Sequence, residues 1–142
     1  MYDEILLPTD GSPGIEAAVE NACYVGKLAD ARIHALFVVD EHVAGAAEWD
    51  MVVEREEARG EEAVEAVEVA ATERGVPVEK HLRRGRPHEE ILEAVDEYDV
   101  DVVVMGTHGR TGFDRFVTAG SVAERVVRHS EVPVMTARAR SE

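Results

Sequence analysis

A segment rich in glycine and hydroxyl side chains follows the most apolar run of this chain. The run DVDVVVM ends at Met105, and residues 106 to 121 then hold four glycines: Gly106, Gly109, Gly112 and Gly120. Glycine permits positive φ and lets backbone N–H groups approach a ligand closely. Gly120-Ser121 also opens an apolar helical pattern, and the unpaired N–H groups at a helix start attract anions. We therefore expect this segment to wrap the phosphates of a ligand.

Ser121 has a purely structural interpretation as well. It can be the N-cap of the following helix, with Glu124 three residues later completing a capping box. A cap does not explain Gly106-Thr107-His108-Gly109 at the tip of a strand, and this favours the phosphate site. The segment is not a Walker loop, because no lysine followed by serine or threonine comes after its second glycine.

Polar residues also follow the first two apolar strands. After the first strand comes PTDGSPG, in which Asp10 or Ser12 can cap a helix that begins at Pro13, a favoured first position. A capped turn is the simplest interpretation of this loop taken alone. After the second strand, the main chain of Val38, Val39 and Asp40 can contact the flat edge of a base.

Three arginines cluster after the third strand. Arg83, Arg84 and Arg86 surround Gly85 in an otherwise acidic chain. As forked donors they can hold an anionic ligand, and as ordinary surface cations they can pair with neighbouring acids.

The pattern of apolar residues alternates between short β-branched runs and longer helical ones. It predicts strands at 4–8, 32–39, 76–82, 100–105 and 132–137, and helices at 13–28, 48–74, 87–98 and 119–129. Strands separated by such helices pair in parallel through right-handed crossovers. The sequence therefore predicts an α/β fold, with one open five-stranded parallel sheet covered on both faces. Its 142 residues fit a single domain, and ligands of such sheets bind beyond the carboxyl ends of the strands.

The charge balance is strongly acidic. Thirty acids face fifteen bases, for a formal net charge of −15, and only Lys27 and Lys80 among the bases are lysine. Such a surface fits a protein of a halophile, since high salt screens its self-repulsion. It argues against sequence-independent binding of nucleic acid, which needs many cations.

Compartment signals are few. No apolar run is long enough for a membrane helix, and the start MYDEILLPTD lacks the basic region and apolar core of a secretory signal. Cys23 cannot form an internal disulfide, and its apolar helical surroundings predict a buried thiol. We expect a cytoplasmic protein with no membrane partner.

Three motifs together resemble the universal stress proteins of the UspA type, over nearly the whole chain. They are PTDGS after the first strand, GRPHEEIL after the third, and VVMGTHGRTG…GSVAERVVR…VPVMTAR at the end. The resemblance implies a Rossmann-like sheet with strand order 3-2-1-4-5. It also implies a homodimer formed by antiparallel pairing of the fifth strands, Val132 to Ala137, which would otherwise leave a long uncharged edge.

The resemblance further implies an adenine-nucleotide site. Family members with the pattern G-x2-G-x9-G-(S/T) bind ATP, and Mg²⁺ is expected to accompany it. Gly106, Gly109 and Gly120-Ser121 match the fixed positions of this pattern. Asp10 is expected at the ribose and the main chain near Val39 at the adenine. The phosphates are expected at Gly109, Arg110, Gly120, Ser121 and Val122. The supporting residues are Pro8, Thr9, Ser12, Gly106 and His108.

The chain departs from this pattern at one place, because ten residues separate Gly109 from Gly120 where the family motif has nine. We expect the extra residue to bulge before the helix and leave the phosphate cradle intact, so that ATP acts as a regulatory ligand. If it instead rotates Gly120-Ser121 away, the protein is a nucleotide-free dimeric interaction module.

An enzyme is the third hypothesis. His108 is the nearest candidate for a general base, although a histidine in a glycine-rich loop is more often structural, and Asp114 is a weaker candidate for holding Mg²⁺. ATP pyrophosphatases of a related fold resemble one another in a Ser-Gly-Gly-x-Asp-Ser loop, and TDGSPG lacks that order. We expect no catalytic residues and at most slow ATP hydrolysis.

The other histidines have no pair at the i, i+4 spacing of a helical metal site, so no structural metal is expected. They are His34, His42, His81, His88 and His129.

Overall fold

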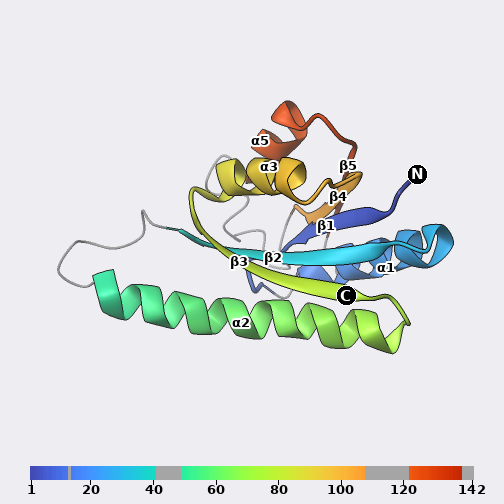
Figure 1. Cartoon of the computed structure of the whole chain (residues 1–142). Helices are drawn as coiled ribbons and strands as arrows, with labels where there is room; N and C mark the ends of the chain where they lie inside the picture. The colour runs from blue at the N-terminus through green and yellow to red at the C-terminus, as the bar shows by residue number, and fades with distance from the viewer. Residues whose placement is uncertain (13, 41–48, 108–121, 139–142) are drawn as a thin grey trace.

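A computed structural model describes residues 1–12, 14–40, 49–107 and 122–138 of the chain. Strands and helices alternate along it (Figure 1). The strands are β1 (Glu4–Pro8), β2 (Arg32–Asp40), β3 (Val78–Gly85), β4 (Val102–Gly106) and β5 (Val134–Ala137). The helices are α1 (Ile15–Ala29), α2 (Trp49–Glu73), α3 (Pro87–Glu97) and α5 (Val122–His129).

The five strands form one parallel sheet in the order β3-β2-β1-β4-β5. This confirms the predicted α/β fold and strand order. Helices α1 and α2 cover one face of the sheet, and α3 and α5 cover the other (Figure 1). Within the described residues, no helix combines the length and apolarity needed to cross a bilayer.

The central strands are apolar on both sides because both faces are covered. In β1, Ile5 and Leu7 pack toward α1 and α2, whereas Leu6 packs toward α3 and α5. All three side chains are fully buried. Cys23 on α1 joins the first of these two cores, which confirms the predicted buried thiol, and burial raises its pKa.

The start of α1 differs from the prediction. The helix begins at Ile15, and Gly14 occupies its N-cap position without any side-chain cap. The prediction that Asp10 or Ser12 caps a helix starting at Pro13 is therefore wrong. The Asp10 carboxylate instead accepts a hydrogen bond from the Ser12 N–H at 2.9 Å, which closes a turn within the loop.

Strand β3 extends past its predicted end, because it is an edge strand and can carry charge where it is exposed. Arg83 and Arg84 therefore lie in the strand, not in a loop, and point to opposite faces of the sheet. Arg83 pairs with three carboxylates of α3, namely Glu90 at 2.9 Å, Glu93 at 3.3 Å and Glu97. Arg84 pairs with Glu57 of α2 at 2.9 Å. These two arginines hold neighbouring helices to the edge of the sheet.

Substitution of the two adjacent arginines should lower the free energy of unfolding by unequal amounts. Arg83 is 18% exposed and neutralises three acids, whereas Arg84 is 53% exposed and meets one. We expect Arg83→Ala to lower the free energy of unfolding by about 2 kcal/mol, and Arg84→Ala by less than about 1 kcal/mol. Urea unfolding of both variants, beside the wild type, measures the difference.

Salt dependence provides the control, because both variants change the net charge equally. The Arg83→Ala loss should shrink in molar KCl, where repulsion among Glu90, Glu93 and Glu97 is screened. Equal losses for the two variants, or a loss for Arg83→Ala that grows with salt, would contradict this account of the edge.

Candidate functional site

A small cavity lies where β1 and β2 end, at the carboxyl edge of the sheet. Its volume is about 80 Å³. Among the sequence-predicted site residues it brings together Pro8, Thr9, Asp10 and Val122. The rest of its wall comes from β2 and α3, with Leu36, Phe37, Val38, Asp40, Pro87 and Ile91. Chain segments far apart in sequence thus meet at the place where parallel sheets bind ligands.

The loop after β1 is held by its own hydrogen bonds. The Thr9 N–H donates to the Leu36 carbonyl at 2.8 Å, and the Gly11 N–H donates to the Thr9 hydroxyl at 3.1 Å. Gly11 has φ of +81°, a conformation that favours glycine. Thr9 is buried, so its role in the structure is to shape this loop. Ser12 takes part through the N–H that it donates to Asp10.

Asp10 is half-buried and lines the cavity. Its Oδ1 accepts from the Ser12 N–H, and its main-chain carbonyl accepts from the Arg59 guanidinium. Its second carboxylate oxygen, Oδ2, has no hydrogen-bond partner within the part of the chain that the structure describes. A half-buried oxygen of this kind has acceptor capacity left for hydroxyl groups of a ligand.

Arg59 of α2 is a residue of this site that the sequence did not reveal. Its guanidinium carbon lies 5.6 Å from the ring centre of Phe37, in addition to the contact with Asp10. The helix comes close to the sheet at Gly60, where an added Cβ would lie 2.6 Å from side-chain atoms of Phe37 and Leu82. The missing side chain at Gly60 therefore lets Arg59 reach the loop. An arginine followed by a glycine in a long acidic helix was the only signal.

At the end of β2, side chains and main chain have different surroundings. The Val39 side chain is buried between the sheet and the α1–α2 layer, while Val38 lines the cavity. The Leu36 carbonyl faces β1, and main-chain groups alternate in direction along a strand. The main-chain groups of Val38 and Asp40 therefore face the space beyond the end of β1. These residues flank Val39, near which the adenine contact was predicted.

The glycine-rich segment is described only at its ends. Gly106 is the last residue of β4, and the Thr107 N–H donates to the Ala137 carbonyl at 3.2 Å. An added Cβ at Gly106 would lie 3.4 Å from the Gly14 carbonyl, an ordinary contact. Val122 begins α5 and is buried against the α3 layer. The other predicted phosphate residues lie outside the described residues: His108, Gly109, Arg110, Gly120 and Ser121.

Two of the histidines that looked scattered in the sequence lie together. His34 of β2 and His81 of β3 approach to 2.9 Å between ring nitrogens, and neither residue lines the cavity. The i, i+4 criterion applies to one helix and could not detect a contact between neighbouring strands. The signal available was only that both histidines belong to consecutive strands.

Comparison with known proteins agrees with the fold and the sequence motifs. The sequence model of the universal stress protein family matches residues 1–138. Universal stress protein MJ0531 of Methanocaldococcus jannaschii is 34% identical, over 97% of this chain and 83% of the relative. Protein MJ0577 of the same organism superposes with a TM-score of 0.79 and 28% identity, covering 100% of this chain and 99% of that one. UspA of Lactobacillus plantarum superposes with a TM-score of 0.79 and 26% identity, covering 96% of this chain and 98% of that one.

Two more distant solved structures are complexes with a nucleotide. One is a universal stress protein in complex with cAMP, and one is from Archaeoglobus fulgidus in complex with dAMP. They are 21% and 18% identical, with TM-scores of 0.76 and 0.74, and so show the fold alone. On the family match and the fold together, the chain belongs to the universal stress protein family.

Proposed function

We propose that this protein binds ATP, together with Mg²⁺, as a regulatory ligand of a dimeric stress-response protein. The observation that carries the proposal is Asp10, a half-buried carboxylate at the carboxyl edge of the sheet. Its Oδ2 has no hydrogen-bond partner among the described residues. A ribose offers two neighbouring hydroxyl donors to such an oxygen. The acidic composition further supports a cytoplasm of high salt as its place of work.

The surroundings of Asp10 fit the rest of an adenine nucleotide. Val38, Ile91 and Val122 give the cavity apolar walls, which suit the faces of a base. Main-chain groups of Val38 and Asp40 face the same space and can meet the edge of that base. Val122, the last of the predicted phosphate residues, lines the cavity, which supports phosphates at this end of it. The nucleotides found with two proteins of this fold add support from outside the chain.

We further propose that the nucleotide is held and not rapidly hydrolysed. Asp10 and Asp40 are the carboxylates in the described lining of the cavity, and one oxygen of Asp10 is occupied by the Ser12 N–H. The expected partner of Asp10 is the ribose, which the α- and β-phosphates separate from the γ-phosphate. Mg²⁺ binds through phosphate oxygens and keeps several waters, so it needs no dedicated cage in the protein.

Calorimetric titration with Mg-ATP in molar KCl tests the site. We expect one ATP per chain for the wild type and binding about 10–100-fold weaker for Asp10→Ala, because a charged hydrogen bond is worth about 1.5–3 kcal/mol. Gly109→Asp, which places a carboxylate among the phosphates, should abolish binding. Phosphate release over hours measures any turnover in the same samples.

Asp96→Asn is the matched control. It removes the same charge on the exposed face of α3, toward the end of that helix remote from Pro87 and the cavity. Its ATP affinity should equal that of the wild type. A folded wild type that shows no binding at millimolar ATP would contradict the proposal. The ten-residue spacing between Gly109 and Gly120 would then favour the nucleotide-free interaction module.

We also propose that β5 pairs with β5 of a second copy to form a homodimer. β5 is an edge of the sheet, and Met135 and Thr136 are exposed. The Pro133 carbonyl accepts from the N–H of Val103 in β4, and the Ala137 carbonyl accepts from the N–H of Thr107 directly after β4. Since main-chain groups alternate in direction, the Thr136 N–H faces outward, where a partner strand can accept it.

Thr136→Pro should convert the dimer to a monomer. Proline removes the outward N–H and blocks approach of another strand, yet it leaves the bonds from Pro133 and Ala137 to β4 in place. Sedimentation velocity in molar KCl measures the mass, with Thr136→Ala as a control that keeps the N–H and stays dimeric. A monomeric wild type, or a Thr136→Pro dimer of unchanged affinity, would refute pairing through this edge.

A further inference from the structure

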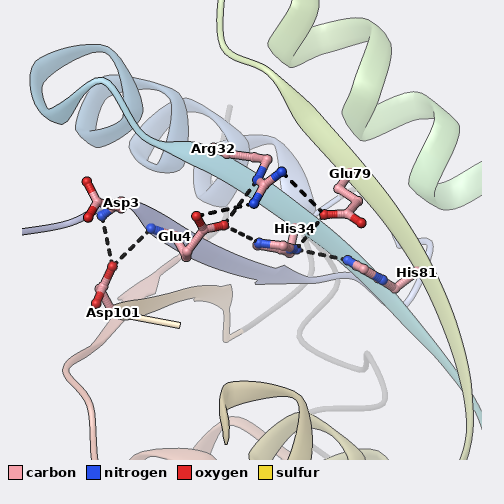
Figure 2. A network of polar contacts seen from close by, with 7 residues as sticks. All are labelled: Asp3, Glu4, Arg32, His34, Glu79, His81 and Asp101. Atoms are coloured by element: carbon pink, nitrogen blue, oxygen red, sulfur yellow. Dashed lines mark hydrogen bonds and ion pairs between the residues drawn. The ribbon is translucent and has the colours of Figure 1, made fainter. Parts of the chain in front are cut away.

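A polar cluster lies on the α3-facing side of the sheet, near the amino ends of β1, β2 and β3 (Figure 2). At its centre is His34, which is only 3% exposed. His34 Nδ1 lies 2.9 Å from His81 Nε2 and 3.5 Å from Glu79 Oε2. His34 Nε2 lies 2.5 Å from Glu4 Oε1. A buried imidazole is thus surrounded by a second imidazole and two carboxylates.

The two imidazoles meet edge to edge. Their ring centres are 5.1 Å apart and their planes differ by 22°, while the facing nitrogens are 2.9 Å apart. The line that joins the two ring centres therefore passes through the facing nitrogens. These two nitrogens form one hydrogen bond, with a single proton between them. The Tyr98 ring lies nearly parallel to His81, with centres 4.1 Å apart, and limits how far that ring can tilt away.

The orientation of His34 is fixed by a carboxylate that is itself held. Glu4 accepts from Arg32 Nε and Nη2 at 3.1 and 3.3 Å, and its N–H donates to Asp101 at 3.0 Å. In the tautomer whose Nε2–H donates to Glu4, the Nδ1 lone pair of His34 points toward His81 and Glu79. A carboxylate behind a histidine is the usual outer partner of a histidine that binds metal.

We propose that His34 Nδ1, His81 Nε2 and Glu79 Oε2 bind a divalent transition-metal ion, with Zn²⁺ the best fit. Imidazole and carboxylate ligands suit Zn²⁺, and three such ligands leave a fourth position for water. The three atoms all lie within 4.8 Å of one another. No other such group occurs among the residues that the structure describes.

The distances are near those of a tetrahedral site. Bonds of about 2.0–2.1 Å place neighbouring ligand atoms about 3.3–3.4 Å apart. The separation of 3.5 Å between His34 and Glu79 already fits, and the two imidazole nitrogens must part by less than an ångström. The ion takes the place of the proton between the two nitrogens, and the single proton of the His81 ring then lies on Nδ1, away from the metal. Burial lowers the pKa of His81, as does His34 beside it, and a lowered pKa favours the uncharged ring that a metal ion needs.

Among the residues that the structure describes, Arg32 is the arginine or lysine that pairs with Glu79. Its Nη1 lies 3.7 Å from Glu79 Oε2, and both side chains are about half exposed. A pair of that kind is weak, so its loss costs little when a metal binds. Arg32 keeps its two bonds to Glu4, which continues to orient His34.

This site is separate from the proposed nucleotide site. It lies near the amino ends of the strands, and the cavity lies at their carboxyl ends. Titration of the full chain with Zn²⁺ alone, without nucleotide, tests it independently of ATP binding. In molar KCl with millimolar Mg²⁺ present, we expect one Zn²⁺ per chain, because imidazole ligands resist competition from Mg²⁺.

Variants assign the ion to the cluster. His81→Ala should abolish binding, and Glu4→Gln should weaken it about 10–100-fold by loosening His34. His129→Ala, which removes an exposed histidine of α5, is the matched control and should bind as the wild type does. Urea unfolding of each variant verifies that it is folded.

Nitrogen NMR of histidine-labelled wild type decides the matter even if a variant fails to fold. Zn²⁺ should shift His34 Nδ1 and His81 Nε2 strongly and leave His129 unchanged. Unshifted His34 and His81 resonances at saturating Zn²⁺, or equal binding by folded His81→Ala, would overturn the proposal.

Discussion

The structure depends on burial of the central strands β1 and β4 on both faces. Once helices cover both sides, the strand interiors must be apolar, as Ile5, Leu6 and Val103 are, each with 0% exposure. Polar chemistry is then restricted to the ends of the strands and to the edges of the sheet. The Asp10 loop occupies one strand end, and the Arg83–Arg84 pair occupies an edge. The positions available for function follow from this single requirement.

The same requirement explains how much of the fold could be predicted. Apolar runs separated by helical patterns determine a parallel sheet almost without regard to detail, and Asp10 could be placed at a strand end because that sheet has only one edge for ligands. Element ends were harder to predict. β3 extends to Gly85 because acids of α2 and α3 neutralise its arginines, and that pairing is tertiary.

The site residues that the sequence missed depend on distances between elements. Arg59 reaches the Asp10 carbonyl only because Gly60 lets α2 approach Phe37. His34 meets His81 only because the register of β2 and β3 pairs His34 with Glu79 and Leu36 with His81. Neither a helix approach nor a strand register can be read from one sequence, since both are fixed by how whole surfaces pack.

The His34 cluster is the exception to apolar strand interiors, and its surroundings show the cost of that exception. A buried imidazole must be hydrogen-bonded at both nitrogens, and here Glu4, His81 and Glu79 supply the partners. Apolar packing at the same position would need none of them. Between this cluster and the cavity, Leu6 and Leu36 pack fully buried on the same face. Because that apolar layer separates the two sites, a change at Glu4 or His81 should leave the Asp10 loop in place, and the two binding activities can be measured one at a time.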